Sequence, residues 1–339
     1  MKLKDQSPVV VITGASAGVG RAVALHFASA GYRVGLIARD ETALNVVRQE
    51  IIVMGETAAV AAADVADPDA LFAAAAELEK VLGPIDVWVN DAMETVFSTV
   101  ADISPKEFKR VTEVTYLGAV YGAMAALKLM RTRRRGRIVQ VGSALAYRGI
   151  PLQSAYCGAK HAIHGFIDSL RTELMHEKSR IRVVMVDLPA VNTPQFDWAR
   201  VHADRSPRPM GRPIQPEVAA KAIYVAAHGP WREYWLGRDT LLTILGNSVL
   251  PGFLDRYLAK KAVAGQQTAE PVAATREDNL DWPVTALHRT RGSFDDEAVD
   301  RAMLVPGPLA RAGVVAAGAL MFCGLGAVLR SLTAPRTLR

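Results

Sequence analysis

The sequence predicts an α/β protein, a doubly wound parallel sheet with helices on both faces, followed by a C-terminal extension. Apolar runs of strand length alternate with stretches of helical periodicity from residue 8 to about residue 245. A glycine-rich turn joins the first apolar run to the first helical stretch, and polar residues follow the ends of later runs. Such alternation predicts a parallel sheet, because each parallel connection needs a long crossover.

The length allows one large core and a tail. The chain has 339 residues, of which 50% are hydrophobic and 22% are charged. We expect a sheet domain over residues 1–246, an arm or linker over 247–308, and a hydrophobic helix over 309–332.

Charge and cysteine usage restrict the classes of function. The net charge of +6 owes much to arginines between residues 131 and 137, which predict a solvated turn rather than a nucleic-acid surface because no aromatic residue interleaves with them. Cys157 and Cys323 make no disulfide framework, and no metal site is predicted. The N-terminus shows no signal peptide, so we expect a cytoplasmic domain.

The first unit predicts a Rossmann-type anion site. The apolar run 8–13 is followed by a turn with Gly14, Gly18 and Gly20, and then by a helix that stops at Gly31. Glycines let backbone N–H groups approach a pyrophosphate, and a helix N-terminus favours its negative charge. The alternative is tight packing of helix on strand, which also requires glycine.

The second strand, 32–38, predicts the choice of cofactor. It ends at Arg39 and Asp40, where a dinucleotide fold meets the adenosine ribose. A guanidinium can bind a 2′-phosphate, so NADP(H) is favoured over NAD(H), although Asp40 weakens this preference. The alternative is that Arg39 is an ordinary exposed cation at a turn.

Further strands are predicted over 57–63, 85–90, 137–142 and 182–188, with helices over 67–82 and 105–130 between them. A seventh strand is predicted over 231–236, and 240–244 are a possible addition to it. Asp64, Asn90, Ser143 and Pro189 then lie along the carboxyl edge of the sheet, where open α/β sheets bind ligands.

A hydroxyl, a phenol and an amine come together after the fifth strand. Ser143 follows that strand, and Tyr156 and Lys160 share one face of the next helix. An ammonium beside a phenol favours the phenolate, which would lower the tyrosine pKa and suit it to proton transfer. The alternative is an aromatic ring packed on a lysine stem.

These motifs, in this order and spacing, resemble the classical short-chain dehydrogenases/reductases over roughly residues 5–245, and in particular bacterial members of similar length. The resemblance implies that Ser143 and Tyr156 bind the substrate oxygen, and that Lys160 holds the nicotinamide ribose. It implies cofactor contacts along the carboxyl edge, from Gly14, Ser16, Gly18, Val19, Gly20, Arg39, Asp64, Val65, Asn90, Ala92, Tyr156, Lys160, Pro189 and Thr193.

The chain departs from the family pattern in a few places. Asp91 and Met93 stand where the family usually has asparagine and glycine, and Ala190 replaces a glycine. Thr115 matches the position of a catalytic asparagine that fixes a water. Its hydroxyl can also hold a water, so Thr115 is included among the predicted catalytic residues.

The segment 190–216 is predicted to choose the substrate. It is rich in proline and arginine, lacks periodicity, and contains Phe196 and Trp198. Long loops of this kind are commonly lids. Phe196 is predicted to contact an apolar carbonyl substrate; the alternative is that both aromatic residues only fill the core.

The C-terminal extension is predicted to have three parts. Residues 247–264 form an amphipathic helix and 266–299 an irregular arm. The uncharged run 312–329 would reach about 27 Å as a helix, close to the ~30 Å hydrocarbon thickness of a bilayer. It is therefore predicted to be a membrane tail anchor; the alternative is a helix that packs in a dimer.

We therefore expect an NADP(H)-dependent oxidoreductase that interconverts an alcohol and a ketone or aldehyde, most suitably an apolar one. Its partners would be a small-molecule substrate and further copies of the chain in a homo-oligomer. The alternative is a non-catalytic NADP(H)-binding protein that acts as a redox sensor or scaffold, for which Met93 and Thr115 are the sequence support.

Overall fold

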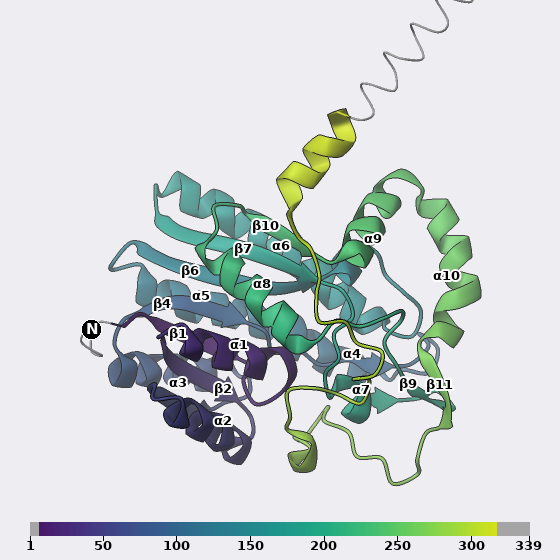
Figure 1. The fold of residues 1–339 in the computed structure, drawn as a ribbon, viewed down its shortest axis with the longest axis horizontal. Helices are drawn as coiled ribbons and strands as arrows, with labels where there is room; N and C mark the ends of the chain where they lie inside the picture. The colour runs from purple at the N-terminus through teal and green to yellow at the C-terminus, as the bar shows by residue number, and fades with distance from the viewer. Residues whose placement is uncertain (1–6, 317–339) are drawn as a thin grey trace, which may run out of the picture.

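The computed structural model describes residues 7–316, and its centre is an eight-stranded sheet with the order β12-β10-β7-β6-β4-β1-β2-β3 (Figure 1). The strands are β1 (Val9–Thr13), β2 (Arg33–Ala38), β3 (Ala58–Ala62), β4 (Ile85–Asn90), β6 (Arg135–Ser143), β7 (Arg180–Leu188), β10 (Glu233–Leu236) and β12 (Leu304–Pro306). The predicted doubly wound sheet is confirmed, because the strand order reverses beside β1, between β2 and β4.

Helices cover both faces of the sheet. The helices α1 (Gly18–Ser29), α2 (Glu41–Val53) and α8 (Pro216–His228) pack on one face. The other face carries α3 (Pro68–Leu82), α5 (Gly118–Met130) and α6 (Ser154–His176). Fully buried strand residues such as Val10 and Val11 point to opposite faces and join the two cores, as the period of two in a strand requires.

One sheet strand was not predicted. β12 pairs with β10 in the antiparallel direction, whereas the other strand pairs of the sheet run parallel. Its three residues, Leu304–Pro306, are too few to show a periodicity. The C-terminal segment therefore completes one edge of the sheet.

The helices after the sheet correct two predictions. Residues 240–244 lie within α9 (Arg238–Val249), so the proposed addition to the seventh strand is wrong. The single helix predicted over 247–264 is divided between α9 and α10 (Pro251–Gly265), which meet at Leu250. Proline has no N–H and suits the first turn of a helix, so Pro251 starts a new helix instead of continuing the old one.

The arm that follows α10 is tied to the rest of the chain by short strands. β11 (Gln267–Pro271) pairs with β9 (Arg205–Pro207), and β5 (Val96–Phe97) pairs with β8 (Arg200–Val201). After β11 the chain runs below α7 (Gln195–Trp198) and returns past α8 (Figure 1). The predicted irregular arm thus lies against the sheet domain.

Within residues 7–316, no helix is long and apolar enough to cross a membrane. Residues 307–316 form a helix, but most of the run 312–329 that is predicted to be a tail anchor lies outside the described residues.

Candidate functional site

The glycine turn between β1 and α1 is shaped by close backbone approach. Gly14 has φ of 73° and Gly18 has φ of 54°, both in the left-handed region that favours glycine. A Cβ at Gly20 would lie 2.2 Å from the carbonyl oxygen of Gly14. The turn lines a cavity together with Ser16 and Val19, so the first turn of α1 can receive an anion there.

The same cavity extends to the ends of β2 and β3. Arg39, Asp64 and Val65 line it; their predicted contact with the adenosine of a cofactor stays a prediction. Arg39 Nη2 donates to Glu94 Oε1 at 2.7 Å and to the carbonyl oxygen of Asn279 at 2.6 Å. The guanidinium is therefore already partnered by a buried carboxyl group and by the C-terminal arm.

Asn90 and Thr13 make hydrogen bonds at the carboxyl ends of β4 and β1, in the middle of the sheet. Asn90 accepts a hydrogen bond from Trp88 Nε1 at 2.7 Å and donates to the carbonyl oxygen of Ala119 at 3.1 Å, which ties β4 to α5. Thr13 Oγ1 accepts from the backbone N–H groups of Asp91 and Ala92, at 3.2 Å and 3.3 Å. Ala92 is thereby fixed against the glycine turn.

Ser143, Tyr156 and Lys160 meet at the carboxyl end of β6. Lys160 Nζ donates to the carbonyl oxygen of Val141 at 2.8 Å, and it lies 5.5 Å from the centre of the Tyr156 ring. The hydroxyl groups of Ser143 and Tyr156 share a hydrogen bond. The structure thus places side by side the three groups that the sequence predicts to act together.

The pKa of Tyr156 is opposite to the expectation. Burial raises it, and the hydrogen bond with Ser143 only partly opposes this effect. Burial also lowers the pKa of Lys160 to about 8, against the attraction of Asp91 and Asp187. The net shift is therefore upward, and in this state the phenol keeps its proton at neutral pH.

Two acidic groups of the site were not predicted as functional. Burial raises the pKa of Asp91 to about 7, although Lys160 and the backbone N–H of Gly20 favour its charged form. Burial raises the pKa of Glu94 to about 8, against Arg39 and Arg110. The sequence signal for Asp91 was its departure from the family asparagine; for Glu94 there was none.

Thr115 lies in a π-helical turn, Glu113–Leu117, between α4 (Pro105–Thr112) and α5. Its buried hydroxyl donates to the carbonyl oxygen of Glu94 and accepts from the N–H of the same residue, both at 3.0 Å. These contacts position the loop that carries Glu94. The contact of Thr115 with a catalytic water stays a prediction.

A second cavity, of about 730 Å³, opens beside the first. Ser143, Tyr156 and Pro189 line it, and Thr193 lines both cavities. A Cβ at Gly18 would lie 3.1 Å from Thr193 Cγ2, so this side chain touches the glycine turn. Much of the lining is apolar and includes Leu145, Ile150, Phe196, Met210, Leu254, Tyr257 and Leu258.

Phe196 both packs and lines the substrate-sized cavity. It is buried, and its ring lies 6.1 Å from the ring of Phe97 and 5.8 Å from that of Phe294. The two alternatives considered for this residue are thus compatible. Its predicted contact with substrate stays a prediction.

Comparisons with known proteins agree with this geometry. The short chain dehydrogenase family profile matches residues 8–202. An uncharacterized oxidoreductase of Bacillus subtilis, YxnA, is 34% identical over 86% of this chain and 82% of its own length. A 3-dehydrosphinganine reductase of Danio rerio is 31% identical, but the match covers only 57% of this chain and 59% of the relative.

Solved structures give the same picture. An actinorhodin polyketide ketoreductase with NADPH superposes with a TM-score of 0.60, at 27% identity, over 68% of this chain and 93% of its own. A 3-ketoacyl-ACP reductase of Sinorhizobium meliloti has a TM-score of 0.59, at 29% identity, over 65% of this chain and 91% of its own.

Proposed function

The chain belongs to the short-chain dehydrogenase/reductase family, and from this premise we propose that it is an NADP(H)-dependent oxidoreductase acting on an apolar alcohol/carbonyl pair. The observation that carries the proposal is the meeting of Ser143, Tyr156 and Lys160 at the sheet edge, beside the glycine turn. The two cavities together offer a place for a dinucleotide and for a substrate.

The residues of the first cavity fit a dinucleotide. The glycine turn lets a pyrophosphate approach the first turn of α1, and Asp64 with Val65 borders the adenine end. Lys160 and Thr193 are at the end that meets the second cavity, where the nicotinamide half would lie. When bound, the cofactor supplies or accepts the hydride at the substrate carbon.

The protein side chains would move the proton. In reduction, the Tyr156 hydroxyl donates its proton to the carbonyl oxygen as hydride arrives on the carbon, and Ser143 Oγ holds the same oxygen. The pKa of Tyr156 is raised in this state, so the phenol carries the proton that reduction needs, but the shift makes it a weaker acid and does not favour one direction. Oxidation requires the phenolate, which Lys160 and the positive nicotinamide ring would stabilise.

The preference for NADP(H) is supported by the position of Arg39 at the end of β2. The guanidinium lines the cavity where the adenosine 2′-position would lie, although it is shared with Glu94 and Asn279. A structural neighbour was solved with NADPH. Asp40 opposes the preference, because a carboxylate suits a 2′-hydroxyl better than a phosphate.

An apolar substrate is supported by the lining of the second cavity. Leu254, Tyr257 and Leu258 of α10 line this cavity together with Ser143 and Tyr156. Burying apolar substrate surface there would contribute roughly 25 cal/mol per Å². A homo-oligomer and a membrane contact through residues 312–329 stay predictions from the sequence.

The test is turnover of a panel of apolar ketones with NADPH by wild-type protein and by Tyr156→Phe. We expect the variant to lose activity by about a thousandfold or more, because the proton donor is removed, while NADPH affinity is retained. Equal turnover by the two proteins would refute the catalytic assignment. Tight NADPH binding without turnover of any ketone, aldehyde or alcohol would support the non-catalytic alternative.

A further inference from the structure

The C-terminal arm contacts the glycine turn and α1, although the contacting residues are more than 260 positions apart in the sequence. The N–H of Gly18 donates to the carbonyl oxygen of Arg289 at 3.0 Å, and Arg21 Nη1 donates to that of His288 at 2.8 Å. These bonds hold His288 beside the first turn of α1. His288, Pro283 and Val284 therefore form an outer wall of the cavity whose inner wall is the glycine turn.

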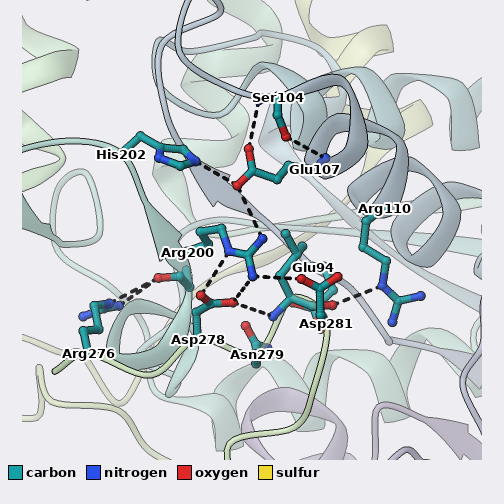
Figure 2. A network of polar contacts seen from close by, with 12 residues as sticks. Glu94, Ser104, Glu107, Arg110, Arg200, His202, Arg276, Asp278, Asn279 and Asp281 are labelled. Carbon is teal, nitrogen blue, oxygen red and sulfur yellow. Dashed lines mark hydrogen bonds and ion pairs between the residues drawn. The ribbon is translucent and has the colours of Figure 1, made fainter. Parts of the chain in front are cut away.

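The arm is fixed over this cavity by a network of charges. Arg200 makes ion pairs with Asp278 at 3.0 Å and with Asp281 at 2.9 Å (Figure 2). Between them, the N–H of Asn279 donates to the carbonyl oxygen of Trp198 at 3.0 Å, and Leu280 is fully buried. The ion pairs of Arg200, the bond from Asn279 to Trp198 and the burial of Leu280 thus help to fix the arm that carries His288.

The ring nitrogens of His288 are buried and lack a well-formed hydrogen bond. Its side chain is 10% exposed, and within the described part of the chain neither nitrogen meets both the distance and the angle of a hydrogen bond, although the backbone of Ser16 lies close enough to favour the charged ring. Nε2 lies 3.2 Å from Asp40 Oδ2, at an angle that gives an ion contact only. A buried imidazole without hydrogen bonds is costly, and this one lines a cavity, so a ligand there can supply the missing partner.

One carboxylate, Asp40, and two cations, Arg21 and Arg39, act on His288. Asp40 caps α2 by accepting from the N–H of Ala43 at 3.0 Å, and it faces His288. Arg21 is already paired with Glu50, and Arg39 is held by a carboxyl group and the arm. Burial lowers the pKa of His288, with Asp40 opposing and the two arginines adding to the effect; a phosphate would favour the imidazolium.

We propose that His288 of the arm binds the 2′-phosphate of NADP(H), so that the arm takes part in the choice between NADP(H) and NAD(H). The proposal rests on the proposed function, which places the adenosine ribose at the end of β2. Asp40 orients the ring through Nε2, and Nδ1 meets a phosphate oxygen. The arm thereby offsets the one carboxylate that opposes a phosphate at this position.

The test is a fluorescence titration of the full chain with NADPH and with NADH, using wild type, His288→Ala and His288→Gln. The matched control is Arg291→Gln, an exposed arm cation that pairs with Glu217 away from the cavity. We expect His288→Ala to weaken NADPH binding about tenfold and NADH binding by less than about twofold. His288→Gln keeps an N–H donor and should show a smaller loss, and the control should show none.

A measurement on the wild-type protein covers the case in which the variants fail to fold. Modification of His288 by diethyl pyrocarbonate, followed by peptide mass mapping, should be slowed by adenosine 2′-monophosphate and not by adenosine 5′-monophosphate. Equal protection by the two nucleotides, or an unchanged ratio of NADPH to NADH affinity in both variants, would overturn the proposal and leave the oxidoreductase function standing. Wild-type protein that binds neither cofactor would overturn both.

Discussion

Lys160 is the side chain through which pH should act on catalysis. Burial lowers the pKa of its ammonium group to about 8, so the charge that is proposed to hold the nicotinamide ribose is lost as pH rises through that value. We expect kcat/KM for reduction to fall above about pH 8, with the pH profile measured at saturating NADPH. In Lys160→Arg the guanidinium stays charged, so the slower variant should lack this fall; the same fall in both proteins would contradict the assignment.

The raised pKa of Glu94 should make the stability of the fold depend on pH. Burial raises its pKa from 4.5 to about 8 in the folded protein, so the folded state keeps a proton that the unfolded state has lost between these values. Stability should therefore fall as pH rises from about 5 to about 8, by on the order of 2 kcal/mol from this group. Glu94→Gln should remove this part of the slope.

The measurement for Glu94 is the free energy of unfolding by urea at both ends of that pH range. Glu77→Gln is the matched control, because Glu77 is 59% exposed and pairs weakly with Lys80. An equal pH slope in wild type and Glu94→Gln would show that the carboxyl group ionises normally.

Single residues divide clearly into those that the sequence could predict and those that it could not. Ser143, Tyr156 and Lys160 are recognisable because their spacing follows a strand end and a helix turn. Glu94 and His288 gain their environment from contacts with Arg39 and Asp40, at separations of 55 and 248 positions. No local pattern records such contacts, and the sign of the Tyr156 pKa shift likewise depends on burial that only the packed structure shows.

At the scale of elements, the arm is expected to control how fast cofactor is exchanged. The cavity beneath it is about 170 Å³, smaller than the 300–1,000 Å³ usual for ligand sites, so we expect the arm to shift when a dinucleotide enters or leaves. Replacing both Asp278 and Asp281 by asparagine removes two ion pairs of Arg200. We expect both the association and dissociation rate constants of NADPH to rise roughly three- to tenfold.

Stopped-flow fluorescence gives both rate constants. Glu217→Gln is the control, since it removes an exposed ion pair of the arm with Arg291 that does not face the cavity. Unchanged rates in the doubly substituted protein would mean that the cofactor passes without movement of residues 278–289.

The elements themselves differ in how well the sequence predicts them. β4 begins and ends as expected at Ile85 and Asn90, because apolar residues at 85 and 87–89 mark a strand that is mostly buried. The arm has no periodicity, yet its Leu280 is fully buried against Val96 and Val111. Its place is decided by the ion pairs of Arg200 and by backbone bonds to α1, which link distant parts of the chain.

At the scale of the whole molecule, Arg311 joins the helix at residues 307–316 to strand β10 of the sheet. Arg311 makes two hydrogen bonds to the buried carboxylate of Glu233, at 2.7 Å and 2.9 Å, and its guanidinium lies 4.9 Å from the centre of the Trp235 ring. Arg311→Gln leaves that carboxylate without its cation. We expect a loss of about 2 kcal/mol in the free energy of unfolding, measured with urea.

The control is Arg301→Gln, because Arg301 is exposed. This variant should keep the free energy of unfolding within about 0.5 kcal/mol of wild type. Glu233→Gln in the Arg311→Gln background should recover part of the loss, because it removes the buried charge. A loss in Arg301→Gln as large as that in Arg311→Gln would contradict this role of the ion pair.

The architecture as a whole was predictable because alternating strands and helices admit few topologies. The edge strand β12 and the return of the arm to the glycine turn were not predictable. Both depend on contacts between residues far apart in the sequence: Trp235 pairs with Val305, and Gly18 bonds to Arg289. The sequence therefore predicts the glycine-turn residues that line the first cavity, but not the arm residues that line it as well.

The most direct test is a crystal structure of the full chain with NADP(H) bound. The account predicts that the nicotinamide lies beside Tyr156 and Ser143, and that the adenosine lies under residues 278–289. A cofactor bound away from Tyr156, or a protein that binds no cofactor while folded, would contradict the central claim that this sheet edge is the active site of an oxidoreductase.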